Sequence, residues 1–189
     1  MIKSKEEYLR YLEQDRLALE KEYKRPKFIG DEIWKFERLL RKVEYYKNCS
    51  TGIIGKCIYF LLFYKYHKLR IKLGYSIPLN VFEEGLSIAH RGTIVVNGNA
   101  KIGKNCRIQE CTTIGATNGS SKAPVLGNNI FIGSGARIIG DVILGDNIAI
   151  GANALVNKSF KDGDITIAGV PAKKISDNNS FSNLSKFIK

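Results

Sequence analysis

Residues 125–157 read VLGNNIFIGSGARIIGDVILGDNIAIGANALVN, and every sixth residue of this stretch is aliphatic. The aliphatic positions are Leu126, Ile132, Ile138, Leu144, Ile150 and Val156. Toward the N-terminus, the same phase takes in Val96, Ile102, Ile108 and Ile114. The residue after each aliphatic is mostly Gly or Asn, and the residue four positions on is small or β-branched. So many in-phase residues indicate an internal repeat with a period of six.

A period of six matches neither an amphipathic helix, which repeats every 3.6 residues, nor a single strand, which repeats every two. It matches short strands joined by tight corners, with each unit forming one flat side of a three-sided prism. Three units close one coil, and stacked coils bury one continuous apolar column. We expect Gly and Asn at the corners to supply backbone angles that other residues avoid. The sequence therefore predicts mostly β structure over residues 74–175.

The segments around the repeat differ from it in composition. Residues 1–73 place apolar residues at helical spacing, which predicts an α-helical N-terminal region, and Ser4 with Glu7 resembles a capping box. Residues 116–124 interrupt the repeat without changing its phase, which predicts a loop extruded from one corner of the prism. Residues 176–189 are rich in Asn, Ser and Lys and predict a flexible tail.

The formal net charge is +12, and residues 1–73 hold 18 Lys and Arg against 10 Asp and Glu. This balance favours a phosphate-bearing partner or serves solubility alone, and without a recognised motif we expect no nucleic-acid partner. The N-terminus lacks the apolar core of a secretory signal, and the apolar run at residues 57–64 is too short to span a bilayer. We therefore expect a cytoplasmic protein whose residues 53–73 pack in the core, with peripheral membrane contact as the alternative.

Two further segments carry a family resemblance. Residues 85–96 read GLSIAHRGTIVV, and residues 167–174 read IAGVPAKK. Together with the hexads, they resemble the hexapeptide-repeat acyltransferases over residues 77–175, in particular serine acetyltransferases and the O-acetyltransferases found with surface-polysaccharide genes. The resemblance implies a left-handed parallel β-helix and acetyl-CoA as co-substrate. It also implies a homotrimer with acetyl-CoA between neighbouring β-helices, and by analogy a dimer of trimers joined through residues 1–73.

The resemblance makes His90 the expected catalytic base. Acyl transfer from a thioester needs a base that takes the hydroxyl proton during attack, and histidine suits this task near neutral pH. The other histidine, His67, lies in a basic helical stretch and is expected on the surface. Serine acetyltransferases orient their histidine with an Asp about fifteen residues upstream, where this chain has no acid. Stacking of the coils instead places Glu110 near His90; Glu83 and Glu84 are alternatives, and all three are otherwise solvated carboxylates.

The acceptor is a hydroxyl compound that the sequence does not name. Serine acetyltransferases carry a second histidine in the extruded loop and an Asp directly before the catalytic histidine. Here the loop has no histidine, and Ala89 precedes His90. A serine ammonium group needs a carboxylate partner, so we favour a sugar hydroxyl in surface-polysaccharide assembly. Serine, as in cysteine biosynthesis, is the alternative.

A further resemblance, to galactoside acetyltransferases, implies the contacts of acetyl-CoA. The matching positions are Ser134, Ala152, Asn157, Lys158 and Lys173. Small residues let the pantetheine chain lie along the backbone, and the lysines can meet the phosphates of CoA. Either lysine taken alone is as well explained as a surface charge.

Two rival functions use the same fold. The β-helix carbonic anhydrases bind zinc through three histidines, whereas this chain has two, so we expect no metal. A non-catalytic scaffold or binding module is the second rival. A bare β-helix would not need His90, the extruded loop and the lysine-bearing end together.

Overall fold

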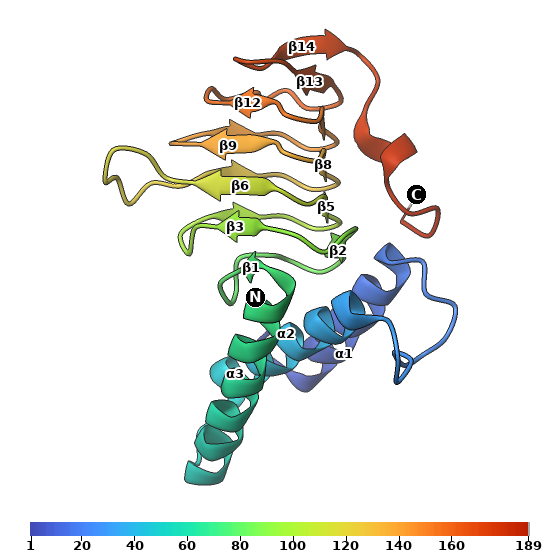
Figure 1. The fold of residues 1–189 in the computed structure, drawn as a ribbon, viewed down its shortest axis with the longest axis vertical. Coiled ribbons are helices and arrows are strands. Elements are labelled where there is room, and N and C mark those ends of the chain that lie inside the picture. The colour runs from blue at the N-terminus through green and yellow to red at the C-terminus, as the bar shows by residue number, and fades with distance from the viewer. Residues whose placement is uncertain (189) are drawn as a thin grey trace.

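Short parallel strands form a three-sided column that stands on a base of three helices, as the computed structural model of residues 1–188 shows (Figure 1). The helices are α1 (Lys5–Ala18), α2 (Glu32–Cys49) and α3 (Ile53–Leu73). The strands are β1 (Tyr75–Ser76), β2 (Ser87–Ile88), β3 (Ile94–Val96), β4 (Lys101–Ile102), β5 (Arg107–Ile108), β6 (Thr112–Gly115), β7 (Val125–Leu126), β8 (Phe131–Ile132), β9 (Arg137–Ile139), β10 (Ile143–Leu144), β11 (Ala149–Ile150), β12 (Leu155–Val156), β13 (Thr166–Ala168) and β14 (Lys173–Ser176).

The three sides of the column are three sheets. Their strand orders are β1-β3-β6-β9-β12, β10-β7-β4 and β14-β13-β11-β8-β5-β2. The repeat sets the register, because Ile132 pairs with Ile150 and Ile138 with Val156, eighteen residues on. Across residues 116–124 the spacing grows to twenty-four, as in the pair of Ile114 with Ile138, so this loop adds one hexad of length and leaves the phase intact. The aliphatic positions form the buried core of the column.

Most glycines that follow an aliphatic residue serve close packing between coils, namely Gly103, Gly127, Gly133, Gly145 and Gly151. A Cβ on Gly103 would lie 2.5 Å from the carbonyl oxygen of Gly127, and one on Gly133 would lie 2.7 Å from the amide nitrogen of Ala152. The positive φ angles fall two residues later, at Asn105, Asn129 and Asn147 among others. The predicted reason for these glycines was therefore wrong, because stacked coils approach too closely there for any side chain.

The asparagines with positive φ also bond to one another. Asn105 Nδ2 donates to Asn129 Oδ1 at 2.8 Å, and Asn129 Nδ2 donates to Asn147 Oδ1 at 2.8 Å. Asn147 Nδ2 donates in turn to Asp164 Oδ1 at 3.0 Å. One corner of the prism thus carries a continuous ladder of side-chain hydrogen bonds that ties successive coils together.

Carboxylates from the helices cap the first coil of the column. Asp15 Oδ1 accepts from the amide N–H groups of Gly85 and Leu86, each at 2.9 Å. Glu44 Oε1 accepts from the amide of Asn80 at 2.7 Å, and Glu37 Oε1 accepts from that of Ile88 at 2.9 Å. These amides lie in the first coil and have no coil beneath them to bond to, so the helices satisfy them instead.

Arg41 joins these carboxylates and bonds to backbone carbonyls. Its guanidinium donates to Asp15 Oδ2 at 2.8 Å and to Glu44 Oε2 at 3.0 Å. It also donates to the carbonyl oxygens of Phe82 at 2.8 Å and Glu83 at 2.7 Å. The Arg41 side chain is completely buried, so each of its donors depends on these partners. We call Asp15, Glu37, Arg41 and Glu44 the buried polar cluster.

The C-terminal tail packs against the molecule, whereas the sequence predicted a flexible segment from residue 176. Strand β14 turns back antiparallel on β13, and a 3₁₀ helix (Ser180–Asn183) follows. The chain then runs down the side of the column toward α1 (Figure 1). Ser180 Oγ donates to the carbonyl of Asn129, and Ser185 Oγ donates to that of Leu17 at 2.8 Å. The serines and asparagines that suggested disorder instead bond to backbone groups of the column and of α1.

The predicted core position of α3 holds for only one face of this helix. Tyr66 and Leu73 are buried, whereas Phe60 and Leu61 are each 67 % exposed. Within residues 1–188, none of the helices combines the length and the apolar character needed to cross a bilayer.

We expect Arg41→Ala to destabilise the protein strongly. Removing the guanidinium leaves Asp15 and Glu44 as buried charges without their cation, and such losses cost about 3–5 kcal/mol. Urea unfolding at a fixed protein concentration measures the change in the free energy of unfolding. Lys42→Ala, a change of the exposed neighbour on α2, serves as the control and should stay within about 0.5 kcal/mol of wild type. Equal stability of the two variants would contradict the role given to Arg41.

Glu37 predicts a pH dependence of stability. Burial, reinforced by the charge of Asp15, raises the pKa of Glu37 well above its ordinary value of 4.5. The folded state therefore holds this proton more tightly than the unfolded state, and its contribution to stability declines as pH rises above the ordinary pKa.

Glu37→Gln keeps a carbonyl oxygen for the amide of Ile88 and removes the ionisation. We expect the variant to gain stability relative to wild type as pH rises from about 5 to about 8. Urea unfolding across that range measures this change, with exposed Glu22→Gln as the control. A constant difference between wild type and Glu37→Gln over the range would contradict the assignment.

Candidate active site

One edge of the prism carries His90, Glu110, Ser134 and Ala152 on successive coils, and we call it the His90 edge. His90 follows β2 and is exposed. Glu110 follows β5 one coil further, and a Cβ on Gly92 would lie 3.0 Å from the Cβ of Glu110. Ser134 follows β8, and its Oγ donates to Glu110 Oε1 at 2.6 Å. The structure thus brings together the two predicted catalytic residues and two of the predicted cofactor-binding residues.

Glu110 is held as a carboxylate beside His90. The hydrogen bond from Ser134 lowers the pKa of Glu110 most, followed by its own backbone amide and by the charge of His90. Its second oxygen, Oε2, is buried and has no hydrogen-bond partner within residues 1–188. No hydrogen bond joins Glu110 to the imidazole ring in this part of the chain. The stacking prediction therefore places Glu110 correctly as a neighbour, and its orienting role stays a prediction.

Tyr75 holds the main chain at His90, and the sequence did not reveal this contact. The Tyr75 hydroxyl donates to the carbonyl oxygen of His90 at 2.9 Å. Burial, together with the nearby charge of Glu37, raises the pKa of Tyr75, so the hydroxyl keeps its proton as a donor. Tyr75 lies fifteen residues before His90, where the resemblance led us to look for an acid. That spacing was the available signal, but a tyrosine at this position did not suggest a contact with the backbone.

The alternative orienting carboxylates are engaged elsewhere. Glu83 accepts hydrogen bonds from the N-terminal amino group at 2.8 Å and from the Tyr11 hydroxyl. Glu84 forms ion pairs with Arg10 at 2.5 Å and with Lys104 at 3.0 Å. Both glutamates thus join the helical base to the column. Of the three carboxylates that the sequence offered, Glu110 is the one that lies beside His90.

Two of the remaining predicted cofactor residues, Asn157 and Lys158, lie away from the His90 edge within one chain. Asn157 and Lys158 follow β12, at the corner that the loop of residues 116–124 occupies two coils earlier. Lys173 begins β14. Lys158 and Lys173 are exposed, and neither forms an ion pair with any described residue. A single chain therefore does not assemble all five residues into one site.

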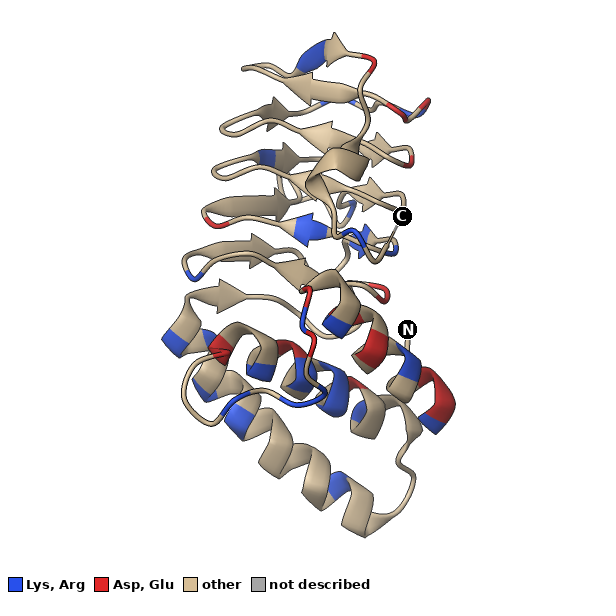
Figure 2. Cartoon of the chain, turned by 90° about the vertical axis from the view of Figure 1, so that its right-hand side faces the viewer, with Lys and Arg blue, Asp and Glu red and all other residues tan. Residues whose placement is uncertain are grey.

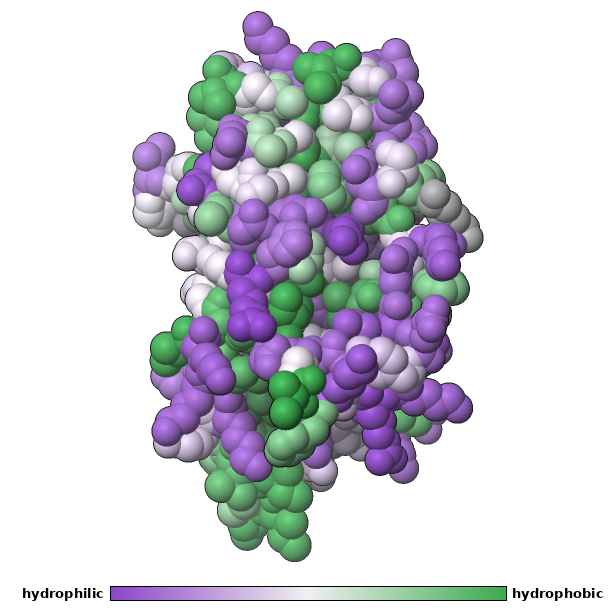
Figure 3. All heavy atoms as spheres, turned by 45° about the vertical axis from the view of Figure 1, so that its right-hand side comes forward, coloured by the Kyte–Doolittle hydropathy of each residue, from purple (hydrophilic) through white to green (hydrophobic). Residues whose placement is uncertain are grey.

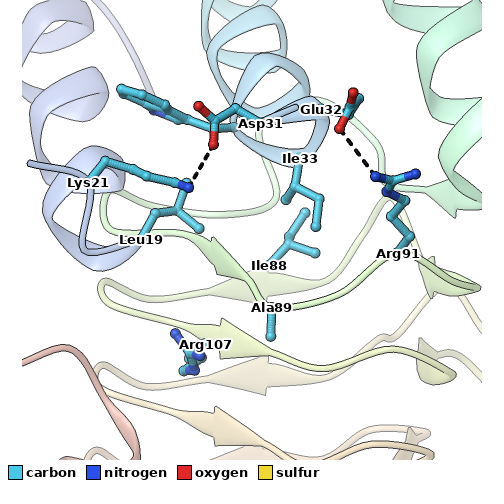
Figure 4. A pocket seen from close by; sticks show the side chains of 10 residues that line it. Leu19, Lys21, Asp31, Glu32, Ile33, Ile88, Ala89, Arg91 and Arg107 are labelled. Atoms are coloured by element: carbon cyan, nitrogen blue, oxygen red, sulfur yellow. Dashed lines mark hydrogen bonds and ion pairs between the residues drawn. The ribbon is translucent and has the colours of Figure 1, made fainter. Parts of the chain in front are cut away.

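A cavity of about 300 Å³ opens beside the His90 edge, between the helical base and the column (Figure 4). Ala89 and Arg91, the two neighbours of His90, contribute to its wall. Arg91 pairs with Glu32 at 3.3 Å, while Arg107 donates to the Ser87 hydroxyl at 3.1 Å. The sequence could not reveal this cavity, because its walls come from the α1–α2 connection and from two separate coils.

The opposite wall of the cavity carries an ion pair of its own. Lys21 Nζ lies 2.7 Å from Asp31 Oδ1. Although burial acts in the opposite direction, hydrogen bonds from Lys21, the Lys27 amide and Tyr23 lower the pKa of Asp31 to about 2. The cavity therefore presents fixed charges of both signs.

Metal-binding side chains do not gather in the described part of the chain. Among residues 1–188, no group of three or more His, Cys, Asp or Glu side chains is arranged to hold a metal ion.

Comparison with known proteins adds the following. Residues 123–158 match the bacterial transferase hexapeptide family (six repeats). The serine acetyltransferase of Synechococcus elongatus is 32 % identical over 112 residues, which are 58 % of this chain and 46 % of the relative. That of Helicobacter pylori strain J99 is 35 % identical over 93 residues, which are 48 % of this chain and 54 % of the relative. The chain spans about half the length of the curated relatives that it matches.

Solved structures match nearly the whole chain. The crystal structure of serine acetyltransferase in complex with coenzyme A from Brucella abortus strain S19 aligns with a TM-score of 0.69 at 22 % identity, covering 93 % of this chain and 70 % of that one. The soybean serine acetyltransferase apoenzyme aligns with a TM-score of 0.70 at 19 % identity, covering 90 % and 69 %. The predicted resemblance is confirmed: the chain carries the bacterial transferase hexapeptide repeat and has the left-handed β-helix fold of the serine acetyltransferases.

Proposed function

We propose that this protein is an acetyl-CoA-dependent O-acetyltransferase in which His90 is the catalytic base. The observation that carries this proposal is the His90 edge, where an exposed imidazole lies one coil from a carboxylate held by Ser134. An imidazole in that position can take the proton of an acceptor hydroxyl as its oxygen attacks the thioester carbonyl. The resulting imidazolium can then return the proton to the departing thiolate of CoA.

Glu110 has the geometry of a positioning residue. Ser134 occupies Oε1 and leaves Oε2 unbonded, so the carboxylate retains one acceptor without a partner among the described residues. A carboxylate that accepts the distal ring N–H would fix the tautomer of His90 and stabilise the imidazolium during transfer. The charge interaction between the two groups supports this role.

A homotrimer would explain why the cofactor residues lie on two edges. Ser134 and Ala152 lie on the His90 edge, whereas Asn157 and Lys158 lie at the next corner of the prism. Packing three prisms around an axis places one such corner against the His90 edge of its neighbour, so that each acetyl-CoA would be held by two chains. Lys158 and Lys173 are free to pair with its phosphates.

Serine is the acceptor that we propose first. The relatives are serine acetyltransferases, and they support this alternative better than the sugar that the sequence favoured. The cavity beside His90 also suits a zwitterion, because Arg107 has no carboxylate partner among the described residues while Asp31 and Glu32 supply negative charge. Asp31 is already bonded to Lys21, so Glu32, whose pair with Arg91 spans 3.3 Å, is the carboxylate that we propose for the ammonium group.

A sugar hydroxyl is the second candidate. It is supported by Ala89 directly before His90 and by a loop at residues 116–124 that contains no histidine. A neutral sugar needs neither of the polar groups that these positions lack.

The decisive experiment measures CoA release from acetyl-CoA with serine, free sugars and nucleotide sugars as acceptors. We expect transfer to one class, and we expect His90→Ala to lower kcat by about 10²- to 10⁴-fold, because the variant has no base to take the hydroxyl proton. His67→Ala on the exposed face of α3 is the control and should turn over like wild type. Near-normal turnover of His90→Ala would refute the assignment of the base, and no acetyl transfer to any acceptor would refute the proposed activity.

Glu110→Gln tests the positioning role. We expect kcat to fall by about tenfold or more while the KM for acetyl-CoA changes little, because the amide can no longer stabilise an imidazolium. Steady-state kinetics of Glu110→Gln and of exposed Glu6→Gln on α1, which does not line the cavity, measure the difference. If both variants have wild-type kcat, Glu110 does not act on His90.

A further inference from the structure

Helix α3 is apolar on two opposite faces, and only one of them packs in the protein. Tyr66 and Leu73 are buried, and Tyr59, Leu62, Phe63 and Leu69 pack against the core. The other face exposes six large apolar side chains by 58 to 82 %: Ile53, Ile54, Phe60, Leu61, Tyr64 and Ile71. A helix that is apolar all round normally has both faces covered.

The exposed side chains form one continuous stripe. Their spacing of three, four and seven residues places them on the same side of a helix. Figure 3 shows the resulting apolar surface at the end of the molecule that α3 forms. A patch of this kind on an otherwise polar surface marks a site of contact with another apolar surface.

Positive charge surrounds this stripe. Helix α3 contains five Lys and Arg residues and no Asp or Glu, and the lowest helix in Figure 2 accordingly shows blue without red. At 100° per residue, Lys56 lies on one border of the stripe and Lys65 on the other. Exposed Lys68 lies within the stripe, with its Nζ 5.0 Å from the centre of the Tyr64 ring. Long lysine side chains at such borders can keep their charges in water while their stems lie along the apolar surface.

This distribution of charge decides which partner fits. A second copy of the same face would bring two sets of three cations together (Lys56, Lys65 and Lys68) with no carboxylate of α3 between them, which opposes association. An anionic lipid surface offers apolar chains for the stripe and negative headgroups for the lysines.

We propose that α3 lies in the interface of an anionic lipid membrane and holds the protein there as a peripheral protein. The stripe enters the boundary between headgroups and acyl chains, and Lys56, Lys65 and Lys68 pair with the phosphates. The opposite face of α3 remains packed on the core. The column, at the far end of the molecule, then stands away from the lipid (Figure 1).

Cosedimentation of the full chain with vesicles tests this proposal. We expect binding to vesicles of phosphatidylcholine with phosphatidylglycerol, little binding to phosphatidylcholine alone, and weaker binding as salt increases. Phe60→Ser with Leu61→Ser should lower the partition coefficient by about tenfold or more, because it removes two large apolar groups from the interface.

The matched control is Val170→Ser with Ile175→Ser. These side chains are 71 % and 63 % exposed, similar to the 67 % of Phe60 and Leu61, but lie at the opposite end of the molecule. The control should bind vesicles like wild type. Circular dichroism of both double variants verifies that the fold is retained. A third variant, with Lys56, Lys65 and Lys68 changed to Gln, should lose about fivefold in affinity for each removed charge.

Two results would overturn the proposal. One is the absence of binding to anionic vesicles, or binding that Phe60→Ser with Leu61→Ser leaves unchanged. The other is a change in oligomeric state of that variant in sedimentation velocity, without a change in vesicle binding, which would identify a second copy as the partner. His90→Ala should bind vesicles normally, so this test is independent of the proposed catalysis.

Discussion

The first coil of a β-helix has backbone N–H and C=O groups with no coil beneath them, and Arg41 with its carboxylate partners satisfies many of them. Unpaired groups at the end of a sheet are costly when buried and invite association when exposed. Asp15 and Glu44 accept from amides of the first coil, and Arg41 donates to two of its carbonyls. Because these contacts fix two helices to the column, they also fix where the rest of the helical base lies.

The candidate site inherits its geometry from this cap. Glu37 bonds to the amide of Ile88, two residues before His90, and Tyr75 bonds to the carbonyl of His90. The helical part of the protein therefore fixes the main chain around His90. Glu110 lies beside His90 on the next coil of the column. The connection between α1 and α2 closes the cavity whose other wall holds Ala89 and Arg91. A column without its helices would keep the His90 edge but lose this cavity.

The sequence predicted those features that repeat along the chain. The period of six yielded the prism, the phase of the extruded loop and the placement of Glu110 one coil from His90. The period of six could not reveal the contacts of Tyr75 or Arg41, because a buried hydrogen bond between distant segments produces no repeating pattern in the sequence. It also misassigned the glycines, since close approach and positive φ both favour glycine and only the structure separates them. The contacts of the tail left no signal in the sequence, because Ser and Asn side chains are equally common in flexible segments and in hydrogen bonds to backbone.

The same limit applies to α3. Helical spacing identifies an apolar face, but a helix with two such faces gives no clear signal of which face its own protein covers. The buried polar cluster settles this choice indirectly, since it fixes α2, and α3 packs on α2 and on β1. One apolar face is thereby used to bury Tyr66 against Phe36. The other apolar face of α3 points into solvent, because no other part of the chain covers it among the described residues. This helix carries five cations and no acidic residue. The hydrogen bonds that cap the first coil therefore also determine which face of α3 remains exposed for a partner.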